Sequence, residues 1–166
     1  GEAVHIHIVY PKPPLGCSVF VRYEIAVPRQ MDVDVYTENG GVTVMEVEGA
    51  VEAETWSGNI ELRDTLGPAT VTTSNGSLQL LDVEGSIEAE SGSGSCTVHG
   101  VHGHARLRTT HGDIRVTAAE GTVKARSHSG NLELLRVSGG GALETATGDI
   151  RATFEHVDTA SSLITR

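Results

Sequence analysis

The sequence has few aromatic residues, few basic residues and no long apolar run, and each shortage excludes a class of protein. Aromatic residues are only 4% of the 166 residues, which is lean for a globular core but normal for a thin one of Val, Ile, Leu and Ala. Twelve Lys and Arg stand against 22 Asp and Glu, and the net charge of −10 argues against a nucleic-acid partner and against general binding to anionic membranes. No apolar stretch approaches the roughly 18 residues of a transmembrane helix, so we expect no direct membrane insertion of these residues.

What the sequence has instead is a row of glycines spaced nine residues apart. A fixed internal period indicates a repeat architecture. Since glycine tolerates the positive φ that a tight chain reversal often needs, we place each of these glycines at a turn between strands. The thirteen turn glycines are Gly40, Gly49, Gly58, Gly67, Gly76, Gly85, Gly94, Gly103, Gly112, Gly121, Gly130, Gly139 and Gly148.

Every second glycine has the same surroundings, so the repeating unit is eighteen residues. Apolar residues alternate two and four positions after the first glycine of a unit, as Val42 and Val44 do, and again eleven and thirteen positions after it, as Val51 and Ala53 do. This alternation is typical of strands with one buried face. We therefore predict an all-β fold without helices, a parallel β-solenoid (β-helix) with two main strands per coil and about seven coils. Because crossovers between parallel strands are nearly always right-handed, we expect a right-handed coil.

The second apolar pair shows how the coils should stack. Ala69 precedes Val71 in one unit, whereas Ile87 precedes Ala89 in the next, so that the large and small residues exchange places. Stacked layers must interdigitate to reach the density of a protein interior, and this exchange allows it. The exchange also implies a super-repeat of 36 residues. Cys96 stands in an inward row, so we expect a buried free thiol there.

The chain divides into three parts. Residues 1–30 do not follow the nine-residue period and contain two alternating stretches, 1–10 and 17–27, which we interpret as an N-terminal antiparallel β cap on the first coil. Caps of this kind cover the exposed ends of repeat proteins. The solenoid repeats occupy residues 31–152. The period is lost in residues 153–166, which are either a C-terminal cap or a truncated continuation.

A lead-in and a recurring motif carry a resemblance to a known family. Residues 23–28 read Tyr-Glu-Ile-Ala-Val-Pro, and a Thr-x-Asn/Ser-Gly-Asp/Asn-Ile-x-Val pattern follows in four units. The four units are Thr55–Leu62, Thr73–Leu80, Thr109–Val116 and Thr145–Ala152. Over about residues 20–152 the chain resembles the bacterial adhesin-like family of β-strand-repeat domains of unknown function. The resemblance implies an extracytoplasmic, envelope-associated solenoid in the periplasm or at the cell surface, and it brings no catalytic residues.

The first candidate ligand-binding residues are four cations on the outward side of the second strand. They are Arg106, Arg108, Lys124 and Arg126. With eighteen residues per coil they form a two-by-two basic block that acidic residues flank on both sides. The expected ion pairs are Glu88–Arg106, Glu90–Arg108 and Arg126–Glu144. Such pairs contribute roughly 0.2–1 kcal/mol each; the alternative is a site for an anionic glycan or a phosphate, which guanidinium groups bind well.

Two further hypotheses concern metal binding. The first concerns three histidines around one corner, His99, His102 and His104. One of them, His102, stands one coil from both Glu84 and Glu120, and His with carboxylate is a transition-metal ligand set. The other interpretation of these histidines is solvent-exposed polar surface.

The second metal hypothesis is calcium, because nine-residue glycine repeats also occur in Ca²⁺-binding β-rolls. The position after the first glycine of each unit is acidic only at Asp113 and Asp149, which lie two coils apart. Calcium needs several oxygen ligands from adjacent coils, so turn capping explains these residues better. We expect no cofactor.

The remaining candidates have structural interpretations as well. A row of Thr and Ser fifteen positions into each unit shares its parity with buried residues, so we place its hydroxyls inside a corner and not on an ice-binding surface. Four outward carboxylates could resemble a polysaccharide-processing site, but Thr70 and Thr72 separate them into two pairs. The carboxylates are Glu52, Glu54, Glu88 and Glu90. Trp56 lies at a corner, where it covers an edge or contacts a sugar.

These observations lead to three hypotheses of function. We expect a non-enzymatic solenoid with a structural or interaction role, adhesin-like, at a bacterial cell surface. Its partner would be a protein or a glycan, and end-to-end self-association is left open. The alternative is a carbohydrate- or anion-binding module that uses the basic block, and the third is a polysaccharide-processing β-helix enzyme.

Overall fold

The computed structural model describes residues 3–7, 28–156 and 162–165. These residues contain sixteen strands and no helix. The strands are β1 (Ala3–His7), β2 (Asp32–Asn39), β3 (Val42–Met45), β4 (Val51–Ser57), β5 (Ile60–Leu66), β6 (Ala69–Asn75), β7 (Leu78–Glu84), β8 (Ile87–Ser93), β9 (Cys96–His102), β10 (Ala105–His111), β11 (Ile114–Glu120), β12 (Val123–Ser129), β13 (Leu132–Ser138), β14 (Gly141–Thr147), β15 (Ile150–His156) and β16 (Ser162–Thr165).

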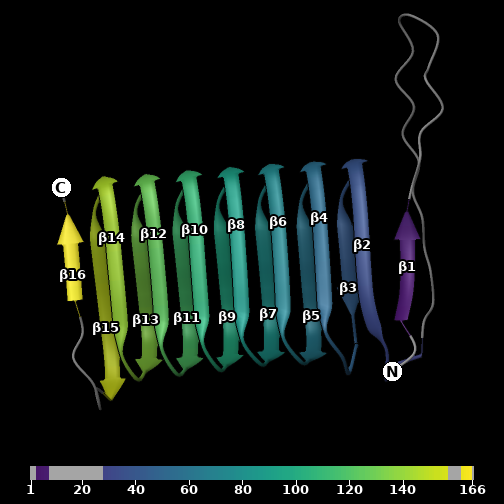
Figure 1. Ribbon diagram of the computed structural model, residues 1–166. Helices are drawn as coiled ribbons and strands as arrows, with labels where there is room; N and C mark the ends of the chain where they lie inside the picture. Colours follow the sequence, from purple (N-terminus) through teal and green to yellow (C-terminus); the bar gives the residue numbers. More distant parts are fainter. Residues whose placement is uncertain (1–2, 8–27, 157–161, 166) are drawn as a thin grey trace, which may run out of the picture.

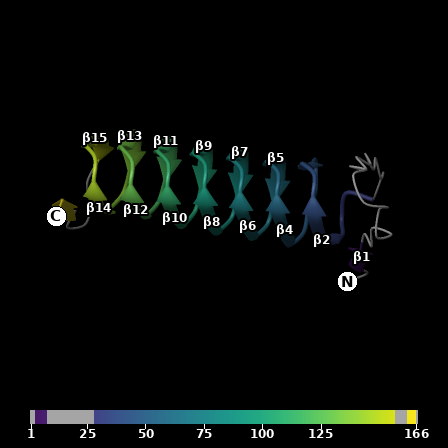
Figure 2. The same ribbon diagram turned by 90° about the horizontal axis from the view of Figure 1, so that it is seen from above.

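The strands form two parallel sheets, one on each side of the molecule (Figures 1 and 2). One sheet has nine strands in the order β1-β2-β4-β6-β8-β10-β12-β14-β16, and the other has seven in the order β15-β13-β11-β9-β7-β5-β3. Successive neighbours in the repeats lie eighteen residues apart, as Val51 and Ala69 do. Each coil therefore consists of one even-numbered and one odd-numbered strand, and the predicted parallel solenoid of about seven coils is confirmed.

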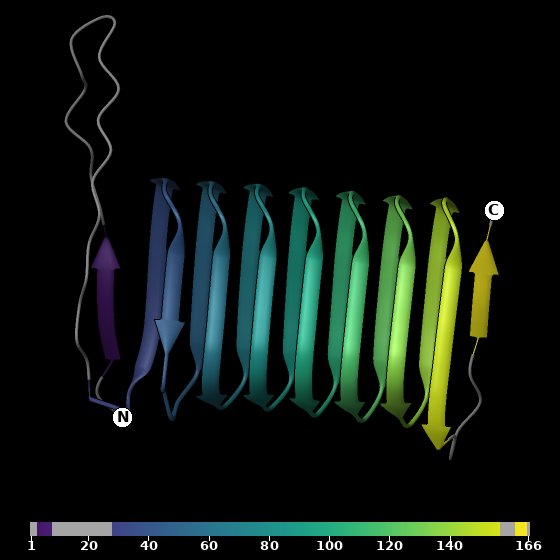
Figure 3. The ribbon, with the colours of Figure 1, turned by 180° about the vertical axis from the view of Figure 1, so that it is seen from behind.

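The coil is right-handed, as predicted. In Figure 1 the even-numbered strands run upward in front and the odd-numbered strands run downward behind them, while the chain advances from right to left. Figure 3 shows the same winding from behind, with the odd-numbered strands in front. This sense agrees with the preference that parallel crossovers show in general.

The core is a stack of aliphatic side chains between the two sheets. The predicted inward rows are buried, for example Ile60 and Leu62 of β5 and Val51 and Ala53 of β4. In the last coil Gly141 takes the place of a side chain, and a Cβ there would lie 3.1 Å from the ring of Phe154. The Phe154 ring, packed against the core, fills this gap next to the last coil.

One inward row was not predicted. It stands seven positions into each unit, three after the preceding inward residue, and consists of Val47, Thr65, Val83, Val101, Ala119 and Val137, all buried. The residue before each has left-handed backbone, with φ between 51° and 66°; these residues are Glu46, Asp64, Asp82, Gly100, Ala118 and Arg136. One left-handed residue bends the strand and shifts the alternation by one position, which turns the seventh residue inward. We name this column of bends the left-handed corner.

The thirteen glycines lie between strands, as predicted, but stacking constrains them as well as the local turn. A Cβ on Gly58, where φ is +159°, would lie 1.9 Å from the carbonyl oxygen of Gly40 on the preceding coil. On the opposite edge of the solenoid, a Cβ on Gly67 would lie 2.3 Å from the carbonyl oxygen of Gly49. The glycines thus form two columns in which each backbone packs directly on the next.

Both ends of the sheets extend beyond the regular repeats. Strand β1 pairs in parallel with β2, with Val4 beside Val33, so the described part of the expected N-terminal cap is a parallel strand of the nine-stranded sheet. Residues 17–27, the expected antiparallel partner of this stretch, lie outside the described residues. At the other end β15 runs past residue 152, and β16 pairs in parallel with β14, with Leu143 beside Leu163.

Candidate functional site

The outward side of the nine-stranded sheet is the most regular surface of the molecule. We call the part of it on β2 to β14, at the front in Figure 1, the front face. Alternation along β4 buries Val51 and Ala53 and exposes Glu52 and Glu54. Because the strands are in register, outward residues of successive coils form columns with a spacing of about 4.8 Å.

The predicted basic block lies on this face. Arg106 of β10 is paired in register with Lys124 of β12, and Arg108 with Arg126. All four side chains are exposed. They border a surface groove of about 210 Å³ together with side chains of β14 that include Glu144.

Two of the three ion pairs expected around the block are present. Arg126 donates to Glu144 at 2.5 Å, and Arg106 lies 3.9 Å from Glu88. Glu90 is the register neighbour of Arg108, but the ion pairs of the described residues do not include this pair. Exposed ion pairs stabilise a protein by about 0–1 kcal/mol, so the two that form contribute little to the fold.

The four carboxylates of Glu52, Glu54, Glu88 and Glu90 lie on the front face, as the eighteen-residue repeat predicted. Thr70 stands in register between Glu52 and Glu88, so the two acidic pairs are two strands apart. At the edge of the same face, Trp56 of β4 is 64% exposed and is the most exposed of the large apolar side chains in the described ranges. Its indole is therefore available for contact with a partner.

The three histidines do not form a ligand set. His102 Nδ1 lies 3.0 Å from Glu120, its neighbour on the next coil, whereas His99 of the same strand is paired in register with Thr117. In the part of the chain that the structure describes, no group of three or more His, Cys, Asp or Glu side chains could hold a metal ion. The cluster of His99, His102 and His104 predicted as a metal site therefore remains at most one hydrogen-bonded pair.

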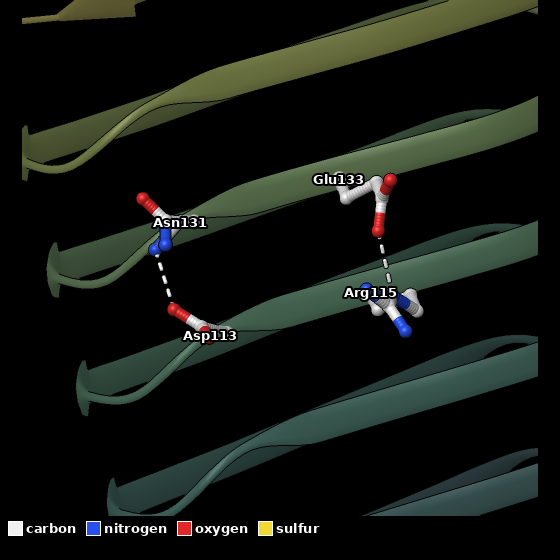
Figure 4. Close-up of polar contacts among 4 residues, drawn as sticks. All are labelled: Asp113, Arg115, Asn131 and Glu133. Atoms are coloured by element: carbon white, nitrogen blue, oxygen red, sulfur yellow. Dashed lines mark hydrogen bonds and ion pairs between the residues drawn. The ribbon is translucent and has the colours of Figure 1, made fainter.

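The polar residues that follow the turn glycines cap the next coil. The Asp113 side chain accepts a hydrogen bond of 2.7 Å from the backbone N–H of Asn131 (Figure 4). Asn131 in turn accepts one of 2.9 Å from the N–H of Asp149. Nearby, Arg115 donates to Glu133 at 2.7 Å across the same two coils (Figure 4). The Asp and Asn oxygens thus bind backbone amides, as the turn-capping interpretation predicted.

The row of Thr and Ser lies inside a corner, as predicted. Its hydroxyls donate to the carbonyl oxygens of turn glycines, as Ser91 does to Gly76 at 2.9 Å. These side chains are buried, so they do not form a surface ladder. Cys96 is likewise buried and free, and its burial raises the pKa of the thiol to about 12.

One polar feature was not anticipated from the sequence. A groove of about 370 Å³ runs along the left-handed corner of the first coils, and its lining includes five carboxylates: Glu46, Glu48, Asp64, Asp82 and Glu84. Arg29 forms an ion pair with Glu46 there, and the hydrogen bond and charge of Glu46 raise the pKa of the guanidinium. The signal in the sequence was the acidic residues just before and after the missed inward row.

Comparison of the chain with protein-family models, with curated proteins and with solved structures finds no match in any of the three. The resemblance to the adhesin-like repeat family therefore stays a hypothesis that depends on the lead-in and the repeated motif. Within residues 3–7, 28–156 and 162–165, no helix is long and apolar enough to cross a membrane.

Proposed function

We propose that the protein is a non-enzymatic solenoid with a structural or interaction role, adhesin-like, at a bacterial cell surface. The observation that carries this proposal is the front face itself, a nearly flat layer of parallel strands in register (Figures 1 and 2). Seven coils at about 4.8 Å make such a layer on the order of 30 Å long. A long, regular face suits an extended partner, as the surfaces of other solenoids do.

The distribution of apolar and polar side chains favours a binding face over a catalytic cavity. Inward residues of the coils are mostly aliphatic, apart from the buried Thr and Ser whose hydroxyls bind the backbone at one corner, and outward residues of the front face are mostly exposed and polar. Enzymes usually place their chemistry in a concave, largely apolar pocket with a few converging polar groups. The two grooves described above are lined by long exposed side chains such as Arg108 and Glu84, with aliphatic residues such as Leu107 beside them in the groove of the basic block.

The location at the cell surface depends on the family resemblance and has a direct test. Intact bacterial cells that make the natural full-length protein would be treated with a protease and labelled with an antibody against the repeats. We expect labelling of intact cells and its loss after the protease treatment. Labelling that requires lysis of the cells would contradict this part of the proposal.

A second candidate function, binding of an anionic glycan, is favoured by one observation. Arg108 and Lys124 take part in none of the ion pairs found among the described residues, although both border the groove of the basic block. Their N–H groups are therefore available for a carboxylate or sulfate group, which guanidinium binds with two parallel hydrogen bonds.

A glycan array separates the two functions. If the block binds glycans, the parent protein gives hits among sulfated or carboxylated glycans, and both Arg108→Glu and Arg126→Glu abolish them. The matched control is Arg115→Glu, which makes the same change of charge on the seven-stranded sheet. No hit with the parent protein supports the structural role, and equal loss in the control shows attraction by net charge alone.

A further inference from the structure

The front face has an acidic half and a basic half. The acidic half lies on β2 and β4, and its residues are Asp34, Glu38, Glu52 and Glu54. The basic half lies on β10 and β12 and is the block of Arg106, Arg108, Lys124 and Arg126. Three strand spacings, about 14 Å, separate β4 from β10, so the two halves do not neutralise each other within one molecule.

Each half holds charges that take part in none of the ion pairs found among the described residues, Glu52 and Glu54 in the acidic half and Arg108 and Lys124 in the basic half. The register neighbours of Glu52 and Glu54 are Asp34 and Tyr36 on one side and two threonines on the other. In the basic half, Arg106 is beside Lys124 and Arg108 is beside Arg126, and the ion pairs of Arg106 with Glu88 and of Arg126 with Glu144 offset only part of this charge. Like charges directly opposite each other in a sheet are destabilising. A partner with the opposite pattern would relieve this repulsion in both halves.

A second copy of the chain has that pattern. A twofold axis along the strands, in front of the face and midway between β6 and β8, places β4 of one copy over β10 of the other and β2 over β12. Residues at the same position of the unit then face each other. Glu52 and Arg106 both stand twelve residues after the first glycine of their units, Gly40 and Gly94 (52 − 40 and 106 − 94).

Most of the opposed residues are complementary, and at the remaining outward position Trp56 faces Thr110 and Ser74 faces Gly92. The facing pairs are Asp34–Lys124, Tyr36–Arg126, Glu38–His128, Glu52–Arg106, Glu54–Arg108, Thr70–Glu88 and Thr72–Glu90, each with one residue from each copy. Four of these join an acidic to a basic side chain, and Tyr36 with Arg126 joins a ring to a guanidinium. The two threonines offer hydroxyl groups to the two central glutamates.

We propose that the front face is the interface of a face-to-face twofold homodimer in which the acidic half of each copy covers the basic half of the other. This inference deepens the proposed interaction role and rests on it. Shifted arrangements are disfavoured: an axis on β8 opposes Glu88 to itself, and an axis on β6 opposes Glu52 to Glu88. An axis midway between β8 and β10 joins Glu88 to Arg106 and Glu90 to Arg108 but opposes Glu54 to Glu144. The proposed register is favoured over it because it joins more acidic and basic side chains and opposes no like charges.

The size of the face fits a modest dimer. Six strands at about 4.8 Å and seven residues at about 3.3 Å give roughly 650 Å² per copy, or about 1,300 Å² in total. This total is at the lower end of the range of stable interfaces. Because charged groups lose hydration when they meet, we expect the attraction to give specificity and sensitivity to salt more than high affinity.

Sedimentation velocity over a dilution series tests the dimer. The parent protein should form a dimer at about 0.1 M salt and dissociate near 1 M, where the screening length falls to about 3 Å. Two variants, Glu52→Arg/Glu54→Arg and Arg106→Glu/Arg108→Glu, should each be monomeric, because like charges then face each other. An equimolar mixture of the two should recover the dimer, because each variant presents to the other the charge that it lacks.

The control variant is Arg115→Glu/Arg151→Glu, which reverses two charges on the seven-stranded sheet and should leave the dimer intact. Circular dichroism would establish that every variant keeps its β-structure. The proposal is overturned if the parent is monomeric at low salt, if either front-face variant alone remains dimeric, or if the mixture does not recover the dimer. A monomeric parent that still labels on intact cells would overturn the dimer and leave the proposed surface role in place.

Discussion

The hydroxyl of Thr73 donates a hydrogen bond of 3.0 Å to the carbonyl oxygen of Gly58, fifteen residues earlier. The same bond recurs in the other coils, for example from Thr145 to Gly130 at 3.0 Å. The carbonyl oxygens of these glycines point toward the glycine of the next coil, where no side chain covers them. A buried hydroxyl at this position of each unit thus provides the partner that the packed backbone requires.

Removal of this hydroxyl is expected to destabilise the protein. Thr73→Val keeps the shape of the side chain but leaves the Gly58 carbonyl without its donor, which should lower the free energy of unfolding by about 1–2 kcal/mol. Urea unfolding followed by circular dichroism measures the change. Thr73→Ser is the control, because serine makes this bond in two other coils and should retain most of the stability.

The same substitution at Thr65 should change the free energy of unfolding in the opposite direction. Thr65 is buried in a row with Val47 and Val83, and within the described residues its hydroxyl has no hydrogen-bond partner. Thr65→Val removes an unsatisfied polar group without a change of shape, so we expect the free energy of unfolding to rise by up to about 1 kcal/mol. A loss as large as that of Thr73→Val would show that this hydroxyl is satisfied by water.

The glycine columns predict a position-specific effect of alanine. A Cβ on Gly76 would lie 1.9 Å from the carbonyl oxygen of Gly58, so Gly76→Ala must separate two coils and should lower the stability by about 3 kcal/mol or more. A Cβ on Gly41 would lie 3.4 Å from its nearest neighbour, the carbonyl oxygen of Asn59, and Gly41→Ala should be nearly neutral. Equal losses at both positions would contradict the stacking explanation.

Because of its left-handed backbone, replacement of Ala118 in the left-handed corner by glycine is expected to stabilise the protein. Ala118 has a φ of +55°, a conformation that costs an L-residue roughly 1–2 kcal/mol. Ala118→Gly relieves this cost and loses about 0.5–1 kcal/mol in the entropy of the unfolded chain, so a net gain of about 0.5–1 kcal/mol is expected. Ala118→Val should destabilise, because a β-branched residue tolerates this conformation poorly. Thermal unfolding of both variants measures the two effects.

The thiol of Cys96 predicts a pH dependence at alkaline pH. Its pKa is raised by burial to about 12 in the folded protein, whereas the thiol of the unfolded chain keeps its ordinary pKa of 9.0. The stability that the buried neutral thiol contributes is therefore fully present below about pH 9 and is lost as the pH rises toward 12, with a slope of roughly 1.4 kcal/mol per pH unit. The stability difference between the parent and Cys96→Val should show this slope, and a difference independent of pH would contradict it.

Most of the fold could be predicted from the sequence because its period is long and uninterrupted. The inward rows, the positions of the turn glycines and the two-by-two basic block all follow from counting eighteen residues, since the register in the structure is eighteen. The predicted histidine cluster is not found among the described residues, and the left-handed Gly100 lies between His99 and His102 on their strand.

Features that depend on a break in the pattern or on side-chain conformations were not predicted. The row of Val47 and Val83 follows only if a residue between the inward positions turns left-handed, and alternation alone gives the wrong parity there. The spacing predicted that Glu90 and Arg108 are neighbours, and they are. Whether two long exposed side chains also meet depends on their rotamers, whose energies differ by less than the cost of ordering them.

The glycine columns also limit how such a molecule can change its length during evolution. Gain or loss of a segment keeps both columns and all inward rows only when the segment is a whole multiple of eighteen residues. The exchange of large and small residues between neighbouring coils, as in Ala69–Val71 against Ile87–Ala89, makes a pair of coils the preferred increment. Size in this architecture is therefore discrete, and duplication in register lengthens the molecule without the need for a new core.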